Sequence, residues 1–217
     1  IATAAEFDWV CIDLQHGLAE MADLTRLLPI LEKNDTFKMV RVLSNDAAAI
    51  GRAFDLGANG VIVPMIETVE EAAAAAAASR YPPKGSRSCG PTRTMAYDPK
   101  YLAHANDGVM CVVMIETAAG FANVAEIAAL PGVDALFVGP VDLSFSLTGS
   151  INGLGSQEFT EALDRVLDAG KAADVPVGVF GLNPDNAGQM LARGFSFCSV
   201  STDTNLMTSA IHSAKSA

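Results

Sequence analysis

The chain of 217 residues is half apolar and only 18% charged, and its 25 acidic side chains against 14 basic ones give a formal net charge of −11. The apolar content excludes an intrinsically disordered chain, and the acidity excludes a general nucleic-acid binder, because phosphate contacts need clustered Lys and Arg. No run of about 18 apolar residues is free of charge, so we expect no membrane span; the alanine tract 72–78 is too short to be one.

The first residues, IATAAEF, are typical of the inside of a helix, and they show no signal-peptide pattern. We therefore expect residues upstream of Ile1 to be missing. The four cysteines, Cys11, Cys89, Cys111 and Cys198, have neither paired nor metal-type spacing. We expect reduced, structural cysteines and a cytoplasmic protein.

Seven short apolar segments rich in Val and Ile recur along the chain. Near-continuous apolar character of this kind predicts strands that are buried on both faces of a parallel sheet. In chain order the predicted strands are 9–13, 38–42, 60–64, 109–116, 135–140, 176–180 and 197–201.

Longer segments with helical spacing lie between these strands. Thr68 and Glu71 form a capping-box pattern ahead of the alanine tract, and Gly57 is placed to end the helix before it. The predicted helices are 22–33, 45–56, the segment after Thr68, 121–130, 156–173, 184–193 and 204–215.

This strand–helix alternation covers the whole chain without a linker, which predicts a single domain over residues 1–217. Seven strands behind an N-terminal helical segment indicate a (β/α)8 TIM barrel whose first strand is missing from this chain. An open, doubly wound sheet is the alternative, but the GxGxxG motif that would follow its first strand is absent.

In a parallel barrel the active site lies at the carboxyl ends of the strands. The polar side chains there form a short set that suits metal and acid–base chemistry. They are Asp13, His16, Arg41, Glu67, Glu116, Asp142, and the pairs Phe180-Gly181 and Thr202-Asp203.

Glu116 and Asp142 are the best candidate metal ligands, because each ends or directly follows a strand and hard divalent cations prefer oxygen ligands. The alternative is that both merely cap turns or helices. Met-Ile-Glu-Thr occurs twice, at 65–68 and 114–117, but Glu67 lies beside the capping box and is explained by the start of a helix.

His16 is the only histidine beside a strand end, and Asp13 is close enough to orient it as an acid–base pair. A polar loop contact is the alternative. Arg41 would be costly to bury unless it met an anion or a neighbouring acid in a structural ion pair. His104 and His212 lie on predicted helix surfaces and are expected to have no function there.

Two segments are candidates for binding anions. The segment 81–93 places Pro, Gly and basic residues in one irregular loop. The segment 139–144, GPVDLS, can present the backbone N–H groups of Val141 and Asp142 to a carboxylate, whereas Pro140 has no N–H and only shapes the loop.

Several motifs, in order, resemble the HpcH/HpaI aldolase family. They are FDWVCIDLQHG, MVRV, DLGANGVIVPMIETVEEA, YPPKGSRSCG, VMIET, PGVDALFVGPVDLS and FCSVSTDT, and they run from about Phe7 to Leu206. Members of this family are metal-dependent (class II) aldolases acting on 2-oxo acids. The resemblance implies a TIM barrel of the phosphoenolpyruvate/pyruvate type.

The resemblance also implies a role for each matching residue. Glu116 and Asp142 match the ligands of a divalent cation (Mg, Mn or Co), His16 matches the catalytic base with Asp13 as its partner, and Arg41 matches the arginine that steadies the enolate oxygen. Gly139 and the N–H groups of Val141 and Asp142 match the pyruvate carboxylate site. The family barrel is a hexamer that exchanges its last helix between subunits, which the segment from Thr204 onward could supply.

Two positions depart from the family pattern: Met114 stands where many members have Gln, and the loop GPTRT adds Arg93. Because of these two differences, the resemblance does not identify the aldehyde that the protein uses. The primary hypothesis is reversible cleavage of a 4-hydroxy-2-oxo acid to pyruvate and an aldehyde. The alternatives are oxaloacetate decarboxylation, a citrate-lyase-type cleavage of an acyl-CoA, and a non-catalytic barrel subunit that binds metal or oxo acid.

Overall fold

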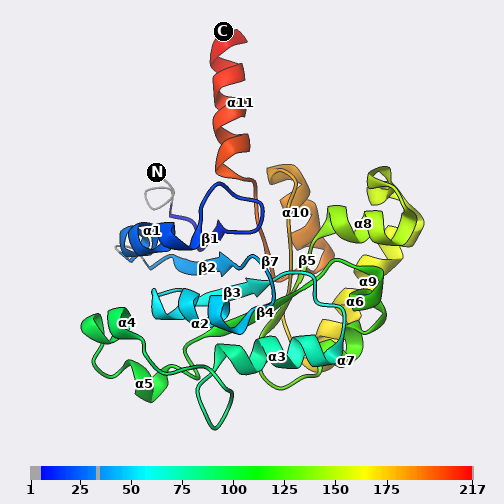
Figure 1. Cartoon of the computed structure of the whole chain (residues 1–217). Coiled ribbons are helices and arrows are strands. Elements are labelled where there is room, and N and C mark those ends of the chain that lie inside the picture. The colour runs from blue at the N-terminus through cyan, green and yellow to red at the C-terminus, as the bar shows by residue number, and fades with distance from the viewer. Residues whose placement is uncertain (1–5, 33–34, 217) are drawn as a thin grey trace.

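The computed structural model describes residues 6–32 and 35–216, so the helical segment expected at the first five residues lies outside the described residues. All seven predicted strands are present in one parallel sheet, in the order in which they occur in the chain. The sheet curls into a half-barrel (Figure 1). Its strands are β1 (Trp9–Asp13), β2 (Phe37–Arg41), β3 (Gly60–Val63), β4 (Met110–Ile115), β5 (Ala135–Val138), β6 (Val177–Val179) and β7 (Phe197–Cys198).

Six helices lie where the sequence pattern predicted them. The Thr68 hydroxyl accepts a hydrogen bond from the N–H of Glu71, whose carboxylate in turn accepts one from the N–H of Thr68, so the predicted capping box is confirmed. No helix within the described residues is long and apolar enough to cross a membrane. The six are α1 (Leu24–Leu31), α2 (Ala47–Asp55), α3 (Val69–Ser79), α9 (Gln157–Ala173), α10 (Pro184–Arg193) and α11 (Asp203–Ser216).

The remaining helices differ from prediction. The helix expected at 121–130 is two short ones, α6 (Ala118–Ala122) and α7 (Val124–Ala128), which are separated by Asn123. The short helix α4 (Thr92–Tyr97) was not predicted, and α5 (Tyr101–His104) was expected only in that His104 was placed on a helix surface. The segment 139–144 is not a loop either, because it begins helix α8 (Pro140–Thr148), which has Pro at its first position and Gly149 in the left-handed conformation at its end.

A two-residue alternation along the strands divides the apolar side chains into two cores. The larger core lies between the sheet and the surrounding helices and includes Val40, Val61, Val113 and Leu136. The smaller core fills the inside of the curled sheet. Its members are Trp9, Cys11, Phe37, Met39, Ile62, Met110, Val112, Met114, Ala135, Phe137, Phe180 and Phe197.

Aromatic contacts across this inner core show how far the sheet curls. The rings of Trp9 on β1 and Phe197 on β7 meet edge to face, with centroids 5.9 Å apart, and Trp9 also contacts Phe137 on β5 at 6.3 Å. β1 and β7 are the two edge strands of the sheet. The contact therefore joins the two ends of the sheet through its packed interior.

The basic residues near segment 81–93 pair with carboxylates of the chain itself. Arg80 binds Asp134 through two hydrogen bonds of 2.6 and 2.7 Å, Arg87 binds Asp55 at 2.6 Å, and the remaining pairs are Lys84–Asp107 and Arg93–Glu32. The expectation that this segment binds an external anion is therefore not supported. Arg93 lies with Glu32 near the amino ends of the strands, so it does not bear on the substrate at the carboxyl ends.

Helix α11 extends away from the barrel (Figure 1), and none of its side chains is buried. Leu206, Met207 and Ile211 are roughly half exposed on it. His212, which the sequence placed on a helix surface, is also exposed there.

Candidate active site

Three polar side chains continue the inward-facing rows of the strands at their carboxyl ends. Asp13 comes two residues after Cys11, Arg41 two after Met39, and Glu116 two after Met114, and all three preceding residues belong to the inner core. Because alternate residues point to the same face of a strand, the polar side chains cover the top of the apolar interior. The two-residue alternation of side chains that forms the inner core therefore also brings the polar residues of the candidate site to the same end of the sheet.

Asp13 and Arg41 form a two-pronged ion pair between neighbouring strands. Arg41 donates from Nε to Oδ1 of Asp13 over 2.8 Å and from Nη2 to Oδ2 over 2.5 Å. Burial alone would raise the pKa of Asp13, but Arg41 and the N–H groups of Gln15 and His16 outweigh burial and hold it below its ordinary value. Of the five guanidinium N–H groups, the two that bind Asp13 leave three without a partner among the residues described.

The Asp13 carboxylate also shapes the loop that carries His16. Its Oδ1 accepts hydrogen bonds from the backbone N–H groups of Gln15 at 3.0 Å and His16 at 3.3 Å. His16 is exposed, and within the described ranges its imidazole makes no hydrogen bond. Asp13 thus contacts His16 through the backbone, and the Asp13–His16 acid–base pair stays a prediction.

Glu116 is the most deeply buried carboxylate of the candidate site, with only 2% of its surface exposed. Its Oε1 accepts a hydrogen bond of 2.8 Å from the N–H of Met65, a residue held at a φ of 56°. Burial raises the pKa of Glu116, and the negative charge of Asp142 adds to this effect, whereas the Met65 N–H, Arg41 and His16 oppose it. Asp142, Arg41 and His16 are therefore close enough to Glu116 for their charges to affect it.

Gly139 provides the space that Glu116 occupies. A Cβ atom at position 139 would lie 2.5 Å from Oε2 of Glu116 and 3.1 Å from Cε of Met114. At 2.5 Å the Glu116 carboxylate would have to shift, because real Cβ atoms essentially never approach another atom so closely, and at 3.1 Å Met114 would have to move by a few tenths of an ångström. Glycine directly after β5 therefore leaves Glu116 in its place.

Asp142 and Val141 lie in the first turn of α8, directly after Gly139. Both side chains are exposed. At the start of a helix the first N–H groups have no intrahelical acceptor, and the helix dipole places partial positive charge there. The N–H groups of Val141 and Asp142 are therefore available to an anion beside the two carboxylates.

The donor set fits a hard divalent cation. Glu116 is a buried carboxylate whose charge is unfavourable where it lies, and the nearby carboxylate of Asp142 makes it more so. A cation between them would offset both burial and repulsion, and both ligands supply oxygen. Within the described part of the chain, no group of three or more His, Cys, Asp and Glu gathers as a metal site, so these two carboxylates would leave most positions of an octahedral shell to water and substrate.

The backbone of Glu67 lies at the start of α3, where the sequence placed it. Its N–H donates to Oε2 of Glu71 at 2.8 Å at the start of α3, and its carbonyl accepts from Asn123 at 2.8 Å. The sequence did not reveal the role of Met65, since nothing in the residue type signals its left-handed backbone. Its position directly after Pro64 at the end of β3 was the only available clue.

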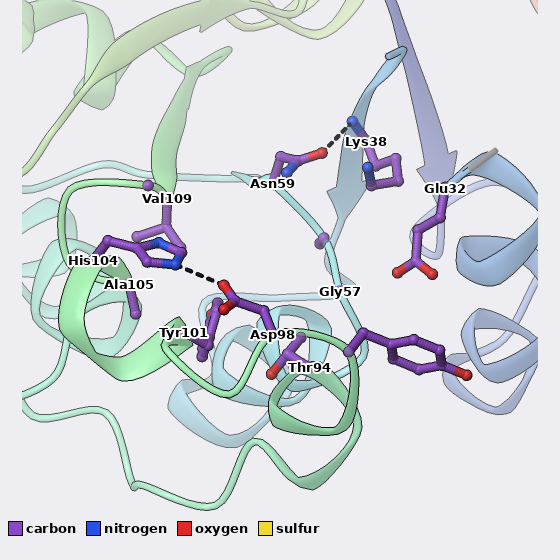
Figure 2. Close-up of a pocket in the computed structure, with 13 residues that line it drawn as sticks. Glu32, Lys38, Gly57, Asn59, Thr94, Asp98, Tyr101, His104, Ala105 and Val109 are labelled. Carbon is purple, nitrogen blue, oxygen red and sulfur yellow. Dashed lines mark hydrogen bonds and ion pairs between the residues drawn. The ribbon is translucent and has the colours of Figure 1, made fainter. Parts of the chain in front are cut away.

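A cavity of about 240 Å³ lies at the other end of the strands, away from these residues (Figure 2). Lys38, Asn59 and Val109, which stand at the amino ends of β2, β3 and β4, help to line it. His104 on its wall is bound to Asp98, with 2.6 Å between Nε2 and Oδ2, and both side chains are about half exposed. In barrels this end contributes stability rather than catalysis.

Comparison with known proteins identifies the class. The profile of the HpcH/HpaI aldolase/citrate lyase family matches residues 1–210. A 2-dehydro-3,6-dideoxy-6-sulfogluconate aldolase of Pseudomonas putida is 39% identical to this chain, and the match covers 94% of this chain and 81% of the relative. A 4-hydroxy-2-oxovalerate aldolase of Rhodococcus jostii is 37% identical, and that match covers 95% of this chain and 81% of the relative.

A solved structure of an HpcH/HpaI aldolase/citrate lyase family protein from Burkholderia cenocepacia superposes with a TM-score of 0.91 and 34% identity. The match covers 99% of this chain and 87% of that one. The chain belongs to the HpcH/HpaI aldolase/citrate lyase family. The resemblance stated from the motifs is thereby confirmed, as is the prediction of a carbon–carbon lyase.

We predict that Gly139→Ala lowers the free energy of unfolding by about 1–3 kcal/mol, because the new methyl group displaces Glu116. The cost should be smaller in a Glu116→Ala background, where the nearest atom is gone, and a double-mutant cycle by urea unfolding measures this. Gly155→Ala is the matched control, since a Cβ there meets nothing within 4 Å. Equal costs in both backgrounds would contradict the contact.

We predict that Asp13→Asn lowers the free energy of unfolding at pH 7 by about 1–3 kcal/mol, because it leaves Arg41 half-buried without its partner. The pKa of Asp13 is depressed in the fold, so its contribution is fully present above the ordinary value of 3.8 and is lost as pH falls through the folded value. Urea unfolding between pH 7 and 3 should show the two stabilities converge at the acid end. Asp107→Asn is the control, because Asp107 belongs to an exposed pair with Lys84, and it should change the free energy of unfolding little. A cost of Asp13→Asn that stays constant with pH would refute the stabilising role of the Asp13–Arg41 ion pair.

Proposed function

We propose that this protein is a class II aldolase that reversibly cleaves a 4-hydroxy-2-oxo acid to pyruvate and an aldehyde. The observation that carries the proposal is the buried carboxylate of Glu116 at the carboxyl ends of the strands, whose pKa is raised by burial and by the charge of Asp142 and lowered by that of Arg41. Family membership supports the same class of reaction, since relatives are named as aldolases of oxo acids.

Glu116 and Asp142 would hold the divalent cation, Mg, Mn or Co. When bound, the cation supplies a Lewis acid that stabilises negative charge on the oxo group of the substrate. Arg41 is positioned by Asp13 so that its free N–H groups can donate to the same oxygen as charge develops there. Because the ion pair already fixes the guanidinium, little reorganisation is needed during the reaction.

The start of α8 would bind the other end of the oxo acid. The N–H groups of Val141 and Asp142 donate to the carboxylate of pyruvate, and Gly139 keeps the backbone close to Glu116. His16 would take the proton of the C4 hydroxyl during cleavage and return it during addition. Its loop is held by Asp13 through two backbone hydrogen bonds.

We further propose that the half-barrel is part of a closed barrel and that the protein is a homohexamer. The seven strands would form part of a closed (β/α)8 barrel of the phosphoenolpyruvate/pyruvate type, with another strand between β7 and β1. The exposed apolar residues of α11 support a homohexamer in which this helix is exchanged between subunits. All four cysteines are free, which supports a cytoplasmic protein.

The first test follows exchange of the methyl protons of pyruvate in D2O by NMR, with and without Mn²⁺ or Mg²⁺. Metal-dependent exchange is expected, because stabilising the enolate makes the C3 protons labile. Glu116→Gln should reduce the exchange rate at least about 100-fold, since it removes the charge but keeps an oxygen for the Met65 N–H.

Glu67→Gln is the matched control, because Glu67 stands in the same Met-Ile-Glu-Thr sequence but serves the start of a helix. It should retain exchange. Absence of exchange in folded, metal-loaded protein would count against an aldolase and would favour the acyl-CoA or non-catalytic alternatives.

The assembly has its own test. Light scattering coupled to size-exclusion chromatography should give a mass near six chains, and Leu206→Ser combined with Ile211→Ser should lower it, because both apolar side chains lie exposed on α11. Leu102→Ser changes an exposed leucine on α5 instead and should leave the mass unchanged. A monomeric wild-type protein would refute the exchanged helix.

A further inference from the structure

Family membership leaves the second product of cleavage open. The named substrates of relatives range from a sulfogluconate derivative to hydroxyoxovalerate. The residues that would hold pyruvate and metal do not choose among aldehydes, because the aldehyde carries the other half of the substrate. The choice must come from other side chains on the segments that follow the carboxyl ends of the strands.

Large, exposed apolar side chains lie on the segments that follow the carboxyl ends of the strands. They come from the loops that follow β1, β2, β3 and β6 and from the first two turns of α8. We call them the apolar mouth: Leu18, Leu43, Met65, Val141, Phe145 and Leu182.

Five members of the apolar mouth lie close in the chain to a candidate site residue, and Leu182 follows Phe180 of the inner core by two residues. Leu18 follows His16 by two residues and is 93% exposed, and Leu43 follows Arg41 by two and is 65% exposed. The backbone N–H of Met65 binds Glu116 itself. Val141 adjoins Asp142, and Phe145 lies one helical turn further along the same face of α8.

Positive charge is scarce at this end of the barrel. In the ranges that the structure describes, Arg41 is the one basic side chain that ends a strand, and Asp13 already neutralises it. Arg26, in the first turn of α1, is paired with Asp23, while Arg80 and Arg87 pair elsewhere. Because Arg41 is paired with Asp13 and the proposed cation is held by Glu116 and Asp142, no basic side chain at the described strand ends is left to pair with a second anionic group on the substrate.

The floor beneath the site is apolar as well. Met114 is buried, and its Cε would lie 3.1 Å from a Cβ at Gly139. Phe180 packs into the same inner core at the end of β6. The side chains beneath Glu116 are thus apolar, and the apolar mouth adds exposed apolar side chains after the strand ends.

From these observations we infer that the aldehyde partner is uncharged and apolar, and that the apolar mouth binds it; the inference rests on the proposed function. In the addition direction, C3 of pyruvate loses a proton and forms a bond to the carbonyl carbon of the aldehyde, whose oxygen takes up a proton. The substituent of the aldehyde then lies against the apolar mouth. An anionic substituent would be desolvated there without a counter-charge.

The test compares two aldehydes with four-carbon chains, butanal and succinic semialdehyde, in addition to pyruvate with the holoenzyme. They differ in a terminal methyl group against a carboxylate. We expect kcat/KM for butanal to exceed that for succinic semialdehyde by at least about tenfold. Pyruvate exchange in D2O is measured on the same preparation.

Variants of the apolar mouth test whether its side chains set the preference for butanal over succinic semialdehyde. Leu43→Arg and Leu18→Arg place a cation in the apolar mouth and should shift the ratio of the two kcat/KM values toward succinic semialdehyde. Leu102→Arg is the matched control, since it alters an exposed leucine on α5, beside the cavity at the opposite end. It should leave the ratio unchanged.

The outcomes separate this inference from the proposed function. Loss of exchange refutes the aldolase itself. Normal exchange with equal or greater kcat/KM for succinic semialdehyde overturns only the uncharged-aldehyde inference. A ratio that neither Leu43→Arg nor Leu18→Arg shifts overturns the role of the apolar mouth.

Discussion

The alternation of side chains along parallel strands governs both the packing and the chemistry of this protein. In the curled sheet, one set of alternate residues faces the helices and the other faces the inside, where Trp9, Phe137 and Phe197 meet. The inside is too narrow for anything but side chains, so every inward row must be apolar until the strand ends. Asp13, Arg41 and Glu116 are the first inward residues beyond that apolar stretch, which is why they converge.

Electrostatics differ between the two ends of the barrel. At the amino ends, pairs such as Arg80–Asp134 and Arg87–Asp55 are closed within the chain and hold α3 and its following loop in place. At the carboxyl ends, Asp13 and Arg41 are paired, but Glu116 is buried without a cation of its own. Such an imbalance is unfavourable for folding and is typical of a site that a ligand completes.

Much of this could be predicted from the sequence, because strong periodicity and capping signals determine the element types. All seven strands and the capping box at Thr68 were predicted. The start of α8 was missed even though Pro140 and Gly149 carry helix-end signals, because the apolar run before it was assigned to the strand as far as Pro140. The contact of Asp13 with Arg41 was considered only as an alternative, since spacing along the chain does not show which of two neighbours a carboxylate binds.

Other features have no signal in a single sequence. The φ of Met65 and its hydrogen bond to Glu116 depend on how two loops meet, 51 residues apart. The ion pairs of Arg87 and Arg93 depend on partners from distant helices, so a basic loop was interpreted as an anion site. Residue type indicates what a group can do, whereas only the fold shows which partner it has.

The close approach of Gly139 to Glu116 also limits how this sequence can drift over generations. Replacing the glycine would displace the side chain at position 116, and removing that side chain would take away the buried carboxylate of the site. The two positions therefore constrain each other's substitution. Leu18 and Leu43 are 93% and 65% exposed and bear no such restriction, so the segments after the strand ends are free to vary while the residues beneath them stay fixed.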